Sequence, residues 1–232
     1  MEHHQSTETG FRLRDIILGG QDGLVNVLGV ILAVATAVSD SRIVIIAGLA
    51  ATFAESVSMA AVAYTSTKAA KDFYKSEEER ELYEIEHMSK EETDEVREIY
   101  EKKGFNGAEL DAIVNHIISD KQLWLKTMME EELHLYPEEY KNPVKDAVIV
   151  GVSATIGSLV PLLPFLLFPV SDAIIAAIVV SMIVLFLTGW MKGKLTTGKN
   201  FKSGIEMAVI GMAAALIGYG IGAILGVALY AA

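Results

Sequence analysis

Two carboxylates lie in stretches of sequence that otherwise contain no charged residue. Asp22 is the only charge in residues 16–39, and Glu55 is the only charge in residues 43–67. A bland interpretation is that both are protonated acids bonded to neighbouring backbone. Acids within long apolar helices more often mark ion or proton pathways, however, because a carboxylate is costly to keep there. The connection at residues 39–42 is short, so the two stretches should pair antiparallel and bring Asp22 and Glu55 into one zone. We therefore predict that the two acids bind a cation.

Each carboxylate has a second candidate ligand one helical turn away, Asn26 after Asp22 and Met59 after Glu55, so each pair shares a helix face. Oxygen ligands alone suit Mg²⁺ or Ca²⁺, whereas a thioether shifts the preference toward softer ions such as Fe²⁺ or Mn²⁺. Carboxylates must be ionised to bind a metal, so metal and protons compete for them. This competition provides a physical basis for antiport.

A second set of candidate ligands lies in the acidic middle of the chain. Residues 72–145 contain 21 Asp or Glu and 10 Lys or Arg, so their net charge of −11 equals that of the whole chain. Such a block repels nucleic acid and attracts cations. A glutamate-rich helix is usually only a solvated surface, but here acids and thioethers recur at helical spacing. The candidate ligands are Glu81, Glu84, Glu92, Glu95, Met128, Met129 and Glu132.

The same block contains a competing pattern. Glu84 precedes His87 by three residues and Glu131 precedes His134 by three, as in the Glu-x-x-His repeats of di-iron carboxylate bundles. That site needs four helices, and we predict three in this block, at residues 72–88, 90–103 and 108–135. The alternative function, a membrane-anchored di-iron ferroxidase or iron store, therefore ranks second.

The remaining sequence predicts the elements that position these residues. Five apolar stretches are each near or above the roughly 20 residues that cross a bilayer, at residues 16–39, 43–67, 147–171, 173–191 and 207–232. Pro161 and Pro164 should bend the third span. Gly218, Gly222 and Gly226 in the fifth are spaced for close helix packing, within the chain or in a dimer.

The distribution of basic residues predicts the orientation. If the N-terminus is cytoplasmic, the opposite side receives only Arg42, so the positive-inside rule places the N-terminus and the acidic block in the cytoplasm and the C-terminus outside. The cytoplasmic side then collects Arg12, Arg14, Lys68, Lys71, the acidic block, Lys192, Lys194, Lys199 and Lys202. No organelle address is visible, so a prokaryotic plasma membrane is the expected location.

The predicted fold is an all-α membrane protein of five transmembrane helices. A three-helix cytoplasmic metal-binding domain is inserted between helices two and three. The predicted divisions are residues 1–67 with the first two spans, 68–145 with the acidic domain, and 146–232 with the last three spans.

With these residues in place, the chain resembles the vacuolar iron transporter family over essentially its whole length. "DIILGGQDGLVNVLGV" is similar to the family's first span, whose Asp matches Asp22, and "SMAAVAY" to its second, whose Met matches Met59. The seven acidic-block candidates match the family's metal-binding glutamates and methionines. The chain departs from the family at Ala51, where plant-type members carry Glu, and at Val62-Ala63, where many bacterial members carry Gly-Glu. Glu55 is a candidate replacement for that acid.

The resemblance implies a homodimer whose first spans line a path that moves Fe²⁺ or Mn²⁺ out of the cytosol in exchange for protons. It also implies a transporter rather than an enzyme, with no catalytic cofactor. The expected partners are protons, the lipid bilayer, a second copy of the chain and a divalent metal (Fe²⁺, with Mn²⁺, Co²⁺ and Zn²⁺ as further candidates), without nucleic acid.

Overall fold

The computed structural model describes residues 2–137, 142–196 and 198–230, with side chains described from residue 13 to residue 224 of these ranges. Every regular element in the described residues is helical. The chain divides into two compact units. We call Met1–Tyr64 with Val144–Ala232 the apolar unit, and Thr65–Pro143 the acidic unit.

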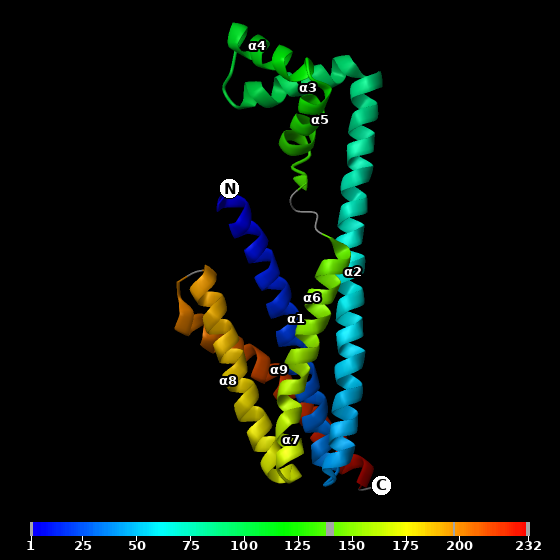
Figure 1. The fold of residues 1–232 in the computed structure, drawn as a ribbon, viewed down its shortest axis with the longest axis vertical. Helices are drawn as coiled ribbons and strands as arrows, with labels where there is room; N and C mark the ends of the chain where they lie inside the picture. The colour runs from blue at the N-terminus through cyan, green and yellow to red at the C-terminus, as the bar shows by residue number, and fades with distance from the viewer. Residues whose placement is uncertain (1, 138–141, 197, 231–232) are drawn as a thin grey trace. The chain divides into compact units, whose positions relative to one another are not determined.

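The apolar unit is built from long helices that could cross a membrane (Figure 1). They are α1 (Glu2–Ala37), the first part of α2 (Ser41–His87), α6 (Pro143–Leu159) continued by a 3-10 turn η3 (Val160–Leu162) and by α7 (Leu163–Leu167), α8 (Val170–Thr196) and α9 (Asn200–Tyr230). Five apolar segments long enough to span a bilayer result, which confirms the five predicted spans among the described residues.

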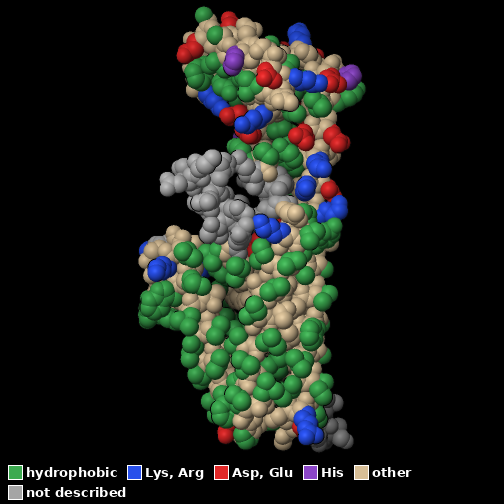
Figure 2. Space-filling view, in the orientation of Figure 1, with side chains coloured by type: hydrophobic (Ala, Val, Ile, Leu, Met, Phe, Trp, Pro, Cys, Tyr) green, Lys and Arg blue, Asp and Glu red, His purple; other side chains and the backbone are tan. Residues whose placement is uncertain are grey.

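Large apolar side chains of this unit point outward. Ile46, Val57 and Ile224 are 68%, 69% and 72% exposed, and Figure 2 shows hydrophobic side chains over the visible face of these helices. A protein in water would bury such side chains, so their exposure fits a lipid surround. The chain is thus a multi-pass membrane protein.

The core of the apolar unit forms around α1. Leu24, Val27, Leu28, Ile31 and Leu32 are at most 1% exposed and pack in one cluster with side chains of α2, α8 and α9. Helix α9 follows α1 closely because small residues meet: a Cβ added at Gly218 would lie 3.2 Å from the Cα of Gly29. The predicted glycine seam therefore packs within the chain at Gly218 and Gly222, and Gly226 lies outside the residues with described side chains.

Pro161 and Pro164 interrupt the third span, as predicted. Helix α6 ends at Leu159, and a 3-10 turn carries Pro161 before α7 resumes with Pro164 near its start. Proline lacks a backbone N–H and clashes with the preceding turn, so a continuous α-helix is excluded here.

The acidic unit contains the charged end of α2, then α3 (Ser89–Lys102), α4 (Gly107–Ile118), α5 (Lys121–Thr127) and a π-helical turn η1 (Met128–Glu132). A small apolar core holds it together, with Ile85, Val96, Val114, Trp124 and Met128 among its buried side chains. Charged side chains are scattered over the visible face of this unit (Figure 2).

The predicted helix at 108–135 is wrong as a single element, and the predicted three-helix arrangement of this block is not confirmed. The chain breaks between α4 and α5 because the carboxylate of Asp120 accepts hydrogen bonds from the backbone N–H groups of Gln122 and Leu123, at 2.9 and 3.3 Å. This N-cap starts a new helix. Among its described residues, the α-helical segments of the unit are α3, α4, α5 and the end of α2, which is one helix of 47 residues from Ser41, and η1 adds a π-helical turn after α5.

Candidate functional site

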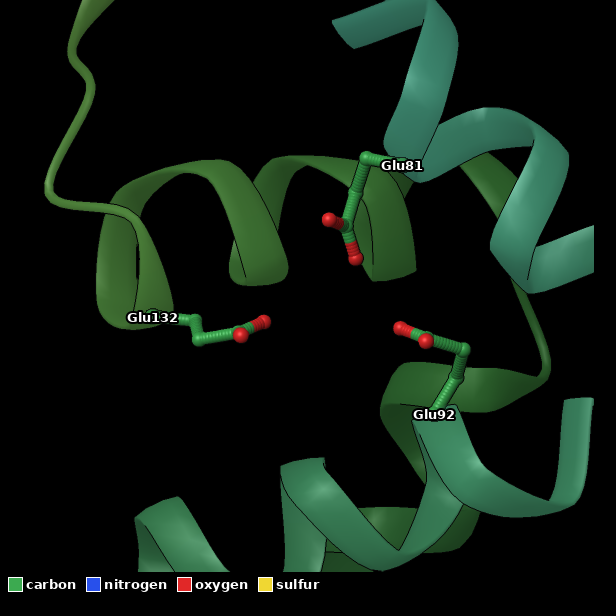
Figure 3. Close-up of side chains that lie close together, drawn as sticks. All are labelled: Glu81, Glu92 and Glu132. Atoms are coloured by element: carbon green, nitrogen blue, oxygen red, sulfur yellow. The ribbon is translucent and has the colours of Figure 1, made fainter. Parts of the chain in front are cut away.

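Three glutamates converge in the acidic unit (Figure 3). Glu81 comes from α2, Glu92 from α3 and Glu132 from η1, and one carboxylate oxygen of each lies within 4.8 Å of the others. Elements distant in sequence thus direct three acids to one point. Three oxygens around a common centre form a donor set for a divalent cation.

Two of these carboxylates are buried. Glu81 is 1% exposed and Glu92 is 4% exposed, and Oε1 of Glu81 and Oε2 of Glu92 have no hydrogen-bond partner among the described residues. Buried polar atoms are nearly always bonded to something. A cation at the centre of the cluster would supply the missing partner for both oxygens.

The three carboxylates belong to the acidic unit and hold protons more tightly than ordinary glutamates. Burial raises the pKa of Glu81 to about 8, helped by a hydrogen bond with Glu92 and by repulsion from Glu92, Glu132 and Glu84. Burial also raises the pKa of Glu132 to about 7, with repulsion from Glu95, Glu92 and Glu84. Burial raises the pKa of Glu92 as well, although Glu92 accepts the proton of Glu81.

The other two predicted glutamates lie at the edge of the cluster. Glu95 makes a side-chain hydrogen bond with Glu132. Glu84 acts on the cluster by charge and has Nε of Arg80 at 3.7 Å from its Oε2. All five predicted acids of the block therefore belong to one electrostatic group, with Glu81, Glu92 and Glu132 at its centre.

The predicted methionines stand beside the cluster on η1. Met128 is fully buried in the apolar core of the unit, and Met129 is 2% exposed. The sequence placed them on one face with Glu132 by α-helical spacing. The turn is instead π-helical, with the N–H of Leu133 bonding to the carbonyl of Met128 at 3.1 Å. π-Turns are rare and occur frequently at functional sites.

One ion pair that sequence reasoning missed fastens η1 to α3. Nζ of Lys103, the C-cap residue that follows α3, bonds to Oε2 of Glu131, next to Glu132. The pair joins positions 28 residues apart, so no helical spacing reveals it.

The histidines of the Glu-x-x-His pattern are elsewhere. His87 stacks on the ring of Tyr83, with centroids 4.1 Å apart, and its Nδ1 lies 2.9 Å from the Tyr83 carbonyl oxygen. Glu131 pairs with Lys103. The converging group found among the described residues contains glutamates alone, so it does not form the di-iron pattern.

The apolar unit holds the second predicted group. The side chain of Glu55 on α2 makes hydrogen bonds with the side chains of Asp22 and Asn26 on α1. Met59 lies one turn beyond Glu55 and is half-buried. The structure thus brings two acids and an amide together within the apolar layer, as the spacing predicted, and leaves Met59 adjacent to them.

Close packing positions this group. Gly23, beside Asp22, lies against α6 so tightly that an added Cβ would be 2.4 Å from the carbonyl oxygen of Ala154 and 2.6 Å from Oγ of Ser158. On α2, the residue after Glu55 is fixed as well, because Thr155 of α6 donates its hydroxyl to Oγ of Ser56 at 2.9 Å. Sequence reasoning did not identify these contacts.

Asp22 and Asn26 also face outward from the unit. Both side chains are exposed. Two hollows of about 270 Å³ each lie between α1 and α9. The lining of the first includes Gln21, Asp22 and Gly211, and the lining of the second includes Asn26, Gly29 and Gly218. Met59 lines neither hollow.

The model of the VIT family matches residues 13–223, which is nearly the whole chain. The chain belongs to the VIT family. The resemblance seen in the sequence is thereby confirmed.

Curated relatives agree with this VIT-family membership. The chain is 34% identical over 214 residues to vacuolar iron transporter 1 of Arabidopsis thaliana, covering 91% of this chain and 86% of the relative. It is 33% identical over 221 residues to vacuolar iron transporter 2 of Oryza sativa subsp. japonica, covering 94% and 90%. A vacuolar iron transporter of Toxoplasma gondii is 32% identical over 234 residues, covering 97% and 77%. This VIT-family chain is accordingly a metal transporter and not an enzyme.

Proposed function

We propose that the protein exports Fe²⁺ from the cytoplasm in exchange for protons, with Mn²⁺ as a second cargo. The observation that supports this most directly is the contact of Glu55 with Asp22 and Asn26 between two apolar helices. A cation-binding group inside the layer is what a carrier needs, and relatives named as iron transporters indicate the cargo.

Proton coupling follows from the same contact. Carboxylates must be ionised to bind a divalent cation, so metal and protons compete for Asp22 and Glu55. Binding of metal from one side and return of protons from the other would then exchange the two.

The cargo preference rests on the sulfur of Met59. Carboxylate and amide oxygens alone favour hard ions, and a thioether moves the preference toward Fe²⁺ and Mn²⁺. Glu55 would supply the acid that this chain lacks at Ala51. Met59 would complete the coordination from one turn away on α2.

A second copy of the chain would complete the pathway. Asp22 and Asn26 are exposed on α1 beside apolar hollows shared with α9. A carboxylate and an amide on the outer face of a transmembrane helix are costly to place against lipid. A homodimer that joins the two α1 helices across this face would cover them.

The acidic unit would gather metal in the cytoplasm. Its cluster of Glu81, Glu92 and Glu132, with Glu84 and Glu95 at the edge and Met128 and Met129 alongside, is a donor set for the same ions. A net negative charge concentrates cations around it. The N-terminus and this unit would share the cytoplasmic side, with the C-terminus opposite.

The proposal is tested by flux into proteoliposomes. Under a pH gradient, the wild-type protein should take up Fe²⁺ and Mn²⁺ while protons move the other way, and Asp22→Asn should abolish both movements. Asp40→Asn, which changes an exposed acid in the turn between α1 and α2, should transport normally. Metal flux without counter-movement of protons would exclude antiport.

The same assay addresses the other functions. A ferroxidase or iron store would oxidise or retain Fe²⁺ equally well in the Asp22→Asn protein, with no flux in either protein. A metal-sensing scaffold would bind metal without flux. Either result would overturn the proposal.

A further inference from the structure

The only charged side chains in and around the turn between α8 and α9 are positive. Residues 173–205 contain no carboxylate and four lysines, Lys192, Lys194, Lys199 and Lys202. All four are exposed and lie within eleven residues. Basic side chains are visible at this end of the α8–α9 hairpin in Figure 2.

Backbone contacts bring the end of α8 and the start of α9 together. The N–H of Gly198 donates to the carbonyl of Gly193 at 2.8 Å, and Gly198 has a φ of +71°, a conformation that favours glycine. The two helices pack so closely that a Cβ added at Gly193 would lie 2.9 Å from the Cα of Asn200. The lysines therefore lie on two closely packed helix ends.

Three of these lysines have little compensating charge. No carboxylate among the residues with described side chains pairs with Lys192, Lys194 or Lys202. The acidic charge of the chain is concentrated in residues 72–145, away from this segment of the sequence. Several uncompensated cations on one turn repel one another and favour an anionic partner.

Exposed apolar side chains surround the lysines. Trp190 is 43% exposed, Phe201 is 65% exposed and Leu195 is 60% exposed. Phe186 holds both aromatic rings in edge-on contacts, at 5.7 Å from Trp190 and 5.6 Å from Phe201. Trp is enriched where a membrane meets water, and this turn follows a span of 27 residues.

We propose that the α8–α9 turn binds the headgroups of anionic phospholipids. The lysines would contact the phosphates, and Trp190, Leu195 and Phe201 would lie among the upper acyl chains. A cluster of lysines next to a membrane span attracts anionic lipid. A soluble phosphate would use the lysines but not the apolar side chains, so the combination favours a lipid.

Trp190 provides a local reporter. Trp124, the second tryptophan, is buried in the acidic unit, so the Trp124→Phe protein reports from the turn alone. This protein is reconstituted in phosphatidylcholine bilayers that contain phosphatidylglycerol. Quenching of Trp190 fluorescence is compared between two bilayers of the same composition. In one the acyl chains of phosphatidylglycerol carry bromine atoms, and in the other the acyl chains of phosphatidylcholine carry them. A Trp190→Phe protein measures the background from Trp124.

Phosphatidylglycerol should be enriched around Trp190 by about threefold or more over its share of the bilayer. The Lys192→Gln, Lys194→Gln, Lys202→Gln triple variant should lower this enrichment to about one. The matched control is Lys75→Gln, Lys90→Gln, Lys102→Gln in the acidic unit, which removes as many exposed lysines and should keep the wild-type value. If the triple variant does not fold, the three single variants should each lose part of the enrichment.

Three results would overturn the proposal. Equal quenching by both brominated lipids in the wild-type turn would show that no anionic lipid is selected. Full enrichment in the lysine variants would assign the selection to other residues. Loss of enrichment on adding inorganic phosphate, compared with chloride at equal ionic strength, would identify a soluble anion as the partner.

Discussion

Glu81 and Glu92 meet from two consecutive helices with carboxylate oxygens within 4.8 Å of each other, and one oxygen of each is buried without a partner among the described residues. Two carboxylates this close cannot both be ionised cheaply unless a cation lies between them. In the metal-free protein near neutral pH, a proton on Glu81 removes one of the two negative charges, because the pKa of Glu81 is raised to about 8. The cluster is thus arranged to exchange protons for metal.

Metal binding to the acidic unit should therefore strengthen as the pH rises from 6 to 8. Glu132 and Glu81, with pKa values of about 7 and about 8, are mostly protonated at pH 6 and must lose those protons to bind a metal. Each displaced proton changes the affinity by about tenfold per pH unit below its pKa. We expect a gain of about tenfold or more for Mn²⁺, measured by titration calorimetry on the full Asp22→Asn protein.

Calorimetry in buffers of different ionisation enthalpy should also show proton release on binding. The triple variant Glu81→Gln, Glu92→Gln, Glu132→Gln serves as the control and should lose this heat. An affinity that is flat between pH 6 and 8, or binding without proton release, would contradict the assignment of the cluster as the metal site.

Stability without metal should change with pH in the opposite direction. Glu81 has a folded-state pKa of about 8, above its ordinary value of 4.5. Between these values the folded protein binds a proton that the unfolded chain does not, so the free energy of unfolding falls as the pH rises from 4.5 to 8. Glu81→Gln mimics the uncharged, protonated form of the side chain at every pH. The substitution should therefore stabilise the metal-free acidic unit at pH 8 and have little effect near pH 4.5.

Denaturant titration followed by Trp124 fluorescence in a Trp190→Phe background measures this effect, because Trp124 lies in the core of the acidic unit. Glu101→Gln changes an exposed acid and should alter stability little at either pH. A Glu81→Gln protein that is less stable than its parent at pH 8 would show that an ionised Glu81 stabilises the fold.

The ion pair of Lys103 with Glu131 should position Glu132 for binding. Lys103→Met removes the link between α3 and η1, so we expect Mn²⁺ affinity to fall about two- to fivefold, in line with the modest contribution of an exposed pair. Lys102→Met is the matched control. It breaks only the pair of Lys102 with Glu98 within α3 and should bind normally. Equal losses in both variants would indicate a general effect of charge.

Much of this architecture could be predicted from the sequence because its physical causes are local. Uninterrupted apolar stretches predicted the five spans, and the i, i+3 spacing of Glu81 with Glu84 and of Glu92 with Glu95 predicted two acidic faces. The meeting of Asp22 with Glu55 followed from two antiparallel spans joined by a short turn. In each case a helical period and a length were sufficient.

The remaining features depend on tertiary contacts. No residue pattern predicts the π-turn at Met128–Glu132, where we expected a continuous α-helix. Asp is a preferred N-cap residue, so Asp120 indicates a helix start, although the predicted helix at 108–135 runs through it. The pair of Lys103 with Glu131 spans 28 positions, and the bond of Thr155 to Ser56 spans 99. Contacts at such separations follow from how helices pack.

Close packing beside Asp22 gives the last prediction. Gly23→Ala would place a methyl group 2.4 Å from the carbonyl oxygen of Ala154, which is backbone and cannot rotate away. Helices α1 and α6 must separate, so we expect a loss of about 1–3 kcal/mol of stability. Because Asp22 is the adjacent residue, metal flux should fall as well. Gly220→Ala is the control, since nothing lies within 4 Å of a Cβ there. Thermal unfolding in detergent and flux in proteoliposomes measure the two effects, and a Gly23→Ala protein that matches Gly220→Ala in both would show that α6 does not position the acid.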